Sequence, residues 1–141
     1  MTEIINNQRK IQLDRQIFQT FAEKVLEIVD EAENKDVTIA FVSDRRMHEL
    51  NKQFRGKNST TDVLSFPFEA DEFDLDENQL GDIIISLEQA EKQANENDLT
   101  LENEIKQLIL HGVLHLCGYD HETDEGEMNR RELKLRDLLE I

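Results

Sequence analysis

Residues 108–121 read LILHGVLHLCGYDH and contain three of the four histidines of the chain, His111, His115 and His121. Four residues advance an α-helix by about 400°, so His111 and His115 are expected on one helix face, about 6 Å apart along its axis. Gly118 stands where a helix commonly ends in a left-handed residue, a conformation that glycine adopts without steric cost. Such an ending turns the chain back and gives His121 a route to the same point.

This spacing indicates a metal site. Two imidazoles so placed can bind one ion at about 2.0–2.1 Å each, and a third leaves a tetrahedral ion one open position, as in catalytic zinc sites. A histidine pair alone is more often two half-buried polar residues, and the third histidine at a fixed offset is what favours a metal here. Three neutral nitrogen ligands make zinc, one ion per chain, the expected cofactor.

The spacing H-x-x-x-H-x-x-G-x-x-H is also that of the metzincin peptidases, which carry a glutamate as general base directly after the first histidine. In this chain that position is Gly112. The sequence therefore has the metal-ligand spacing without the peptidase base, and peptidase activity is not expected. Cys117 lies about 200° round the helix from His115, so we expect it to pack as a small apolar residue rather than bind metal.

The composition indicates one acidic domain over residues 1–141, long enough to bury a hydrophobic core. The single cysteine, the absence of a signal-like start and the lack of an apolar run near ~18 residues predict a cytoplasmic location without membrane contact. A formal net charge of −16 argues against attraction of nucleic acid by the whole protein. Bases nevertheless gather between Arg45 and Lys57, as either a local anion-binding patch or a solvated helix face.

Hydrophobic periodicity predicts short strands and helices along the whole chain. The expected strands are 2–6, 37–42, 63–68 and 82–86, and the expected helices are 14–34, 45–55, 87–97, 101–117 and a last one after 124–127, through Leu139. This order predicts an α+β domain: a small mixed four-stranded sheet covered by about five helices, with a zincin-like metal-binding helix. The acidic run 69–78 is expected to be a loop, and 82–86 to be a strand buried on both faces.

Several segments together resemble a known family. The run HGVLHLCGYDH at 111–121 occurs with Asn51, Arg55, TDVLSFP at 61–67 and GDI at 81–83. This combination resembles the YbeY family of bacterial endoribonucleases, the rRNA maturation factors, over about residues 37–121. The resemblance implies a zinc-dependent, single-strand-specific endoribonuclease that hydrolyses RNA phosphodiester bonds in 16S rRNA 3′-end maturation and 70S ribosome quality control. It also implies His111, His115 and His121 as metal ligands and Arg55 as a functionally required catalytic residue.

The partners that this resemblance implies are single-stranded RNA, namely rRNA within ribosomal particles, together with ribosomal proteins or a ribosome-associated GTPase. From the residues alone, an arginine near a metal suits an anionic substrate, because guanidinium can bind two phosphate oxygens at once. Aromatic side chains on which RNA bases stack are few. Those near the proposed site are Phe54, Phe66, Phe68 and Tyr119, and for most of them packing under the helix is the simpler expectation.

One alternative belongs to a different class: a zinc-stabilised module that binds the ribosome or a protein without catalysis. A structural zinc of that kind would have four protein ligands. The residues leave the nucleophile open between water and the RNA 2′-hydroxyl. They also leave the general base open, with Asp120 as a candidate, and they leave open whether Thr61 and Asp62 orient ligands or only form a turn.

Overall fold

The computed structural model describes residues 2–69, 78–119 and 125–141. The strands are β1 (Thr2–Asn6), β2 (Asp36–Val42), β3 (Val63–Pro67) and β4 (Gln79–Ser86); the helices are α1 (Arg15–Ile28), the short 3-10 helix η1 (Asp30–Ala32), α2 (Asp44–Arg55), α3 (Leu87–Glu96), α4 (Leu101–Leu116) and α5 (Glu127–Leu139). The sheet order is β1-β2-β4-β3. The first three strands of this order are parallel, and β3 runs antiparallel to β4 at the edge. The predicted α+β class and mixed four-stranded sheet are confirmed.

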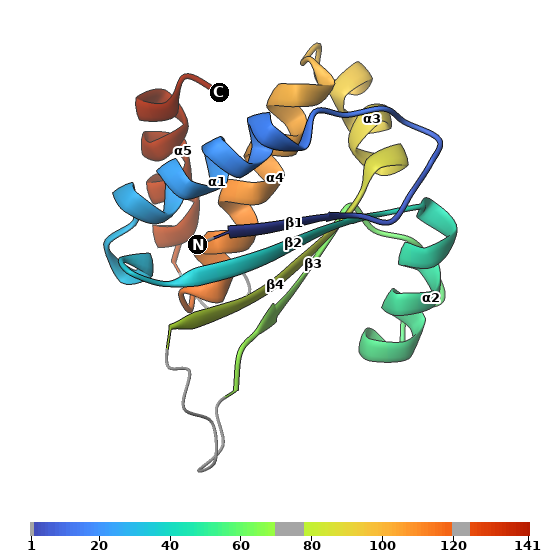
Figure 1. Cartoon of the computed structure of the whole chain (residues 1–141), viewed down its shortest axis with the longest axis horizontal. Helices are drawn as coiled ribbons and strands as arrows, with labels where there is room; N and C mark the ends of the chain where they lie inside the picture. The colour runs from blue at the N-terminus through green and yellow to red at the C-terminus, as the bar shows by residue number, and fades with distance from the viewer. Residues whose placement is uncertain (1, 70–77, 120–124) are drawn as a thin grey trace.

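Helices cover both faces of the sheet (Figure 1). On one face, apolar residues of α1, α4 and α5 form the main core with inward residues of the strands, such as Ile39, Ile83 and Ile85. On the other face, Met47 and Leu50 of α2 pack with Leu64, and Ile84 lies against this smaller cluster. Ile83 and Ile84 point to opposite faces of β4, and each meets a cluster. Asp82 is exposed and Ile84 is only partly buried, so the expected burial on both faces is complete on one face only.

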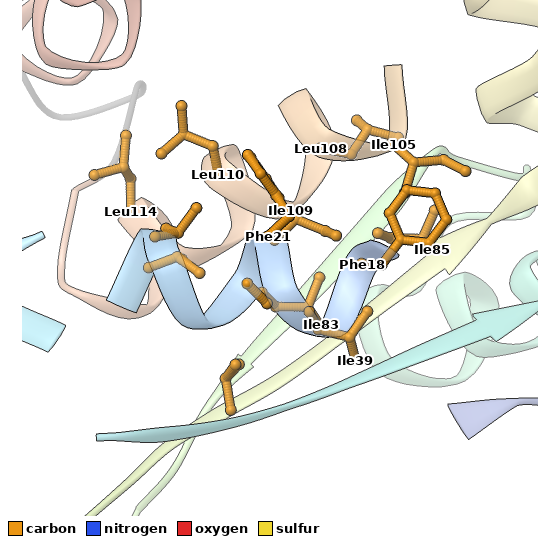
Figure 2. Packing of buried hydrophobic residues seen from close by; sticks show 14 of the residues in the cluster. Phe18, Phe21, Ile39, Ile83, Ile85, Ile105, Leu108, Ile109, Leu110 and Leu114 are labelled. Carbon is orange, nitrogen blue, oxygen red and sulfur yellow. The ribbon is translucent and has the colours of Figure 1, made fainter. Parts of the chain in front are cut away.

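Helix α4 is the central helix of the main core. Figure 2 shows Ile105, Leu108, Ile109, Leu110 and Leu114 of this helix packed with Phe18 and Phe21 of α1 above Ile39, Ile83 and Ile85 of the sheet. A helix that is apolar around most of its circumference is stable only when neighbours surround it. His111 and His115 therefore occupy the one part of the C-terminal half of α4 that is not covered by the core.

Two sequence-based expectations about helix α1 were wrong. Helix α1 ends at Ile28 rather than near Asn34, and Val29 takes an extended conformation. The residues that follow α1 are acidic, and negative charges do not stabilise the negative C-terminal end of the helix dipole. Ile17, expected in the buried stripe, is exposed. Helix α5 begins as expected after a cap within 124–127: the cap is Gly126, which has a left-handed backbone and makes no side-chain hydrogen bond.

The segment between α2 and β3 is held by two polar residues of α2. Asn51 is buried and donates its side-chain amide to the carbonyl oxygen of Ser59 at 2.9 Å. Asp44 accepts hydrogen bonds from the hydroxyls of Thr60 and Ser86. Gly56 ends α2 with φ +67°, a conformation that favours glycine. These contacts fix the position of Arg55, the last residue of α2, relative to the edge strand β3.

Most of the acidic run 69–78 lies outside the described residues. Within the part of the chain that the structure describes, no helix is long and apolar enough to cross a membrane.

Candidate functional site

A cleft of about 670 Å³ lies between β3 and the C-terminal end of α4. Its walls include Arg55 at the end of α2, His111 and His115 on α4, and the continuous segment 61–67 that contains β3. The fold thus brings to one cavity the histidine pair, the arginine and the TDVLSFP segment, which are far apart in the sequence. Strand β3 is at the edge of the sheet, and no described strand lies beyond it on this side.

His111 and His115 lie on one face of α4, as their spacing predicts. Their ring centroids are 4.5 Å apart with planes at 75°, and their Nε2 atoms are 3.0 Å apart. Two nitrogens bound to one tetrahedral zinc at 2.0–2.1 Å each would lie about 3.3 Å apart. The pair is therefore close to the separation that shared binding of one ion requires.

The partners of the two Nδ1 atoms determine which ring nitrogens carry hydrogen. His115 Nδ1 is 2.9 Å from the backbone oxygen of Tyr119, which can only accept, so this Nδ1 donates. His111 Nδ1 is 2.6 Å from Glu132 Oε1, and an ionised carboxylate also only accepts. In the neutral imidazoles both Nε2 atoms then present lone pairs, and two lone pairs 3.0 Å apart repel each other. A cation bound by both nitrogens removes that repulsion, so the donor set fits a metal.

A tight turn after α4 supplies the carbonyl group that orients His115. The backbone N–H of Gly118 donates to His115 O at 3.0 Å, and that of Tyr119 donates to Leu114 O at 3.2 Å. These two bonds are those of a Schellman ending, which needs a left-handed residue. Gly118 provides it with φ +101°, as the sequence predicts. Cys117 caps the helix and packs against the main core, and its burial raises the pKa of the thiol to about 11.

Glu132 is the site residue that sequence reasoning missed. It comes from α5, is almost fully buried, and binds Arg136 Nη2 through its other carboxylate oxygen at 2.7 Å. A carboxylate behind a ligating histidine fixes the ring orientation and increases its basicity as a ligand. The available signal was weak: a glutamate among buried apolar positions of an amphipathic helix, where acids are rarely found without a partner.

Gly112, at the position of the metzincin glutamate, points toward the sheet and away from the cleft. A Cβ built there would lie 2.9 Å from Ile83 Cδ1 and 3.0 Å from its Cγ2. The contact shows that α4 approaches β4 too closely for any side chain at this position. A glutamate there would require Ile83 or the central helix to shift, so packing as well as sequence disfavours the metzincin arrangement.

Thr61 and Asp62 also line the cleft, and their hydrogen bonds are local. Asp62 Oδ1 accepts the backbone N–H of Val63 at 2.8 Å and the Thr61 hydroxyl at 3.3 Å. These bonds support a role of Thr61 and Asp62 in forming the turn, one of the two interpretations that the sequence left open. On the opposite side of His111, a second hollow of about 490 Å³ contains Asp62, Glu104 and Glu132. Burial raises the pKa of Glu104, and the negative charge of Asp62 raises it further.

His121 and Asp120 lie outside the described residues. The predicted third ligand and the candidate base are therefore not placed. Among residues 2–69, 78–119 and 125–141, no group of three or more His, Cys, Asp or Glu side chains is arranged to bind a metal.

Basic residues next to the cleft differ in how they are paired. Arg45 and Arg46 both approach Glu49, at 4.0 and 3.1 Å. Lys52, Arg55 and Lys57 make no ion pair with any described residue, and all three are exposed. The free positive charge of this segment is thus at the C-terminal end of α2, where Arg55 reaches the cleft.

Known proteins resemble this chain over most of its length. The sequence model of the family described as Endoribonuclease YbeY matches residues 3–140. The Endoribonuclease YbeY of Clostridioides difficile (strain 630) is 38% identical over 133 residues, covering 90% of this chain and 87% of that protein. That of Nautilia profundicola is 46% identical over 109 residues, covering 77% and 76%. The solution structure of TM1509 from Thermotoga maritima has a TM-score of 0.65 and 33% identity, covering 95% of this chain and 85% of that one.

The fold and the matched relatives together define a hydrolase of the ribonuclease class. The match extends over both the histidine helix and the segments that line its cleft. The chain belongs to the YbeY endoribonuclease family.

Proposed function

We propose that this protein is a zinc-dependent endoribonuclease that hydrolyses phosphodiester bonds of single-stranded RNA. The observation that carries the proposal is the histidine pair: two Nε2 lone pairs 3.0 Å apart, in a cleft that also contains Arg55. The names of the relatives support the reaction class. The proposed setting is the cytoplasm, with 16S rRNA 3′-end maturation and 70S ribosome quality control as the process.

His111, His115 and His121 are the residues that would hold the zinc. When bound, zinc supplies Lewis acidity and a water molecule whose pKa is lowered toward about 7. Glu132 and the Tyr119 carbonyl group hold the first two imidazoles with Nε2 directed to the cleft. The second oxygen of Glu132 is paired with Arg136 at 2.7 Å, which holds the orienting carboxylate in place.

Arg55 is proposed to bind the phosphate on which cleavage occurs. It is free of ion pairs with the described residues and lines the same cleft as the histidines. Its guanidinium can donate two parallel hydrogen bonds to phosphate oxygens. An exposed cation at this place also offsets, locally, the repulsion between RNA and a chain of net charge −16.

The test combines metal analysis with cleavage. Purified protein should contain one zinc per chain, and it should cut a single-stranded RNA but leave the same sequence intact in a duplex. Removal of the metal by a chelator should stop cleavage, and added zinc should restore it. Stoichiometric zinc without any cleavage would instead favour the zinc-stabilised binding module, and cleavage that resists both chelation and His111→Ala would refute the proposal.

A further inference from the structure

Phe54 is exposed next to two residues that line the cleft, Arg55 and Phe66, although it belongs to the apolar side of α2. Of its surface, 57% is accessible to solvent. It follows Met47 and Leu50 at helical spacing, but those two are buried against the sheet and Phe54 is not. Its ring meets Phe66 of β3 edge to face, with centroids 5.3 Å apart and planes at 69°. Phe66 itself lines the cleft that contains Arg55, His111 and His115.

Exposure of one aromatic residue is common on protein surfaces and is no argument by itself. What distinguishes Phe54 is the positive charge around it. Its neighbours Lys52, Arg55 and Lys57 are exposed cations that form no ion pair with the described residues. Phe54 thus presents an aromatic ring that a second ring supports and that exposed cations border. This combination suits a ligand that has both a flat ring and a negative charge. A nucleotide has both features.

We propose that Phe54, supported by Phe66, is the surface on which an unpaired base of the RNA substrate stacks, while the adjacent Arg55 binds the backbone phosphate. This proposal rests on the proposed function and specifies how the substrate is held. A base in a duplex is already stacked on both sides and cannot lie on Phe54, whereas an unpaired base can. The stacking surface therefore gives a physical reason for preference for single strands.

A protein partner fits this surface less well. Protein interfaces combine several apolar side chains in one patch and are depleted in lysine at their centre. Around Phe54 the described residues of α2 and the following turn are polar or charged: Lys52, Gln53, Arg55, Lys57 and Asn58. Among the residues that the structure describes, the other exposed aromatic side chain is Phe68, which follows β3.

The chain contains no tryptophan, so Phe54→Trp introduces a single fluorescent reporter at the proposed surface. With the metal removed to prevent cleavage, a single-stranded RNA of about ten nucleotides should quench this fluorescence, because bases that stack on an indole quench it. An oligonucleotide of equal length whose sugars lack bases should quench much less. Leu138→Trp is the matched control: residue 138 is exposed on α5, and its reporter should not respond.

Binding measurements then separate stacking from packing. Loss of one stacked base should weaken binding of single-stranded RNA about tenfold or more, so Phe54→Ala should raise Kd by that factor. Phe54→Leu still covers Phe66 but has no aromatic face, and it should resemble Phe54→Ala. Phe54→Tyr should bind like the wild type. In the metal-loaded enzyme the loss should appear mainly in KM, since Phe54 does not touch the reacting phosphate.

Each outcome has a distinct meaning. Absence of quenching at residue 54, or wild-type affinity of both Phe54→Ala and Phe54→Leu, overturns the stacking surface even if the wild type cleaves RNA. Stacking at Phe54 in a protein that never cleaves supports the surface and refutes the proposed reaction. If Phe54→Leu binds normally and Phe54→Ala does not, Phe54 serves only to cover Phe66, and the proposal is wrong.

Discussion

His111 Nδ1 lies 2.6 Å from Glu132 Oε1, and this contact joins the central helix α4 to α5 at the edge of the cleft. The glutamate is almost fully buried, and Arg136 holds its second oxygen. One imidazole of the pair is thus oriented by a side chain from another helix, while the other is oriented by the turn that ends its own helix. Both Nε2 atoms face the cleft as a result.

Glu132→Gln should weaken zinc binding by about 10- to 100-fold, because carboxylates behind ligating histidines contribute that much to metal affinity. The amide keeps the shape of the side chain but removes its charge, and it leaves Arg136 with a weaker partner. The measurement is zinc affinity by competition with a chromophoric chelator. Asp137→Asn removes an exposed carboxylate from the same helix and should leave the affinity unchanged; an equal effect of both variants would contradict an orienting role.

His115→Ala should lose stoichiometric zinc, because one of two converging nitrogens disappears. Zinc binding by the wild type should also weaken as the pH falls, since a proton and the metal compete for the same nitrogen lone pair. Elemental analysis after gel filtration measures the first effect and a chelator titration at several pH values the second. Undiminished zinc in His115→Ala would show that the ion binds elsewhere.

Arg55→Ala should reduce cleavage of single-stranded RNA by about 10²-fold or more, the usual effect of removing a charge that stabilises a transition state. The zinc content and the melting temperature should change little, because Arg55 makes no ion pair with the described residues. Lysine should restore activity only in part, since a point charge cannot bind two oxygens as a guanidinium does. If Arg55→Ala cleaves at nearly the wild-type rate, the side chain only interacts with the helix dipole.

Cys117 should react slowly with iodoacetamide at pH 8 in the native protein and quickly in denaturant. Burial, together with the nearby Glu31 carboxylate, raises the pKa of its thiol from 9.0 to about 11, so little of the reactive thiolate exists at pH 8. The unfolded state loses this proton first, so the group should lower the stability as the pH rises from about 9 to 11. Cys117→Ala should keep its zinc and remove this part of the alkaline destabilisation; loss of the metal would make Cys117 a ligand.

Gly81→Ala should lower the free energy of unfolding by about 3 kcal/mol or more, from backbone strain and overpacking together. Residue 81 has φ +148°, and a Cβ there would lie 2.4 Å from the backbone oxygen of Phe66 and 2.8 Å from Leu116. Gly56→Ala is the control, because residue 56 has φ +67° and open space around it. Its strain alone should cost about 1–2 kcal/mol. Equal urea midpoints for the two variants would contradict the steric account.

The sequence by itself determined the elements and the local part of the site. Helical spacing places His111 and His115 on one face, and Gly118 ends the helix in the conformation that the following turn needs. These features depend on neighbours in the chain, whose geometry follows from backbone sterics. The resemblance in HGVLHLCGYDH and TDVLSFP also indicated the family to which the chain belongs.

Only the tertiary structure decided which distant residues meet these histidines. The contact of Glu132 with His111, the place of Arg55 in the same cleft and the exposure of Phe54 depend on tertiary packing. Helix α5 and strand β3 pack against α4, whereas α2 packs on the other face of the sheet. No periodicity encodes these contacts, because hydrophobic packing fixes the relative positions of whole elements and the polar side chains follow them. The same packing explains why residue 112 is a glycine: a Cβ there would meet the side chain of Ile83 on another element, and its own helix does not require a glycine.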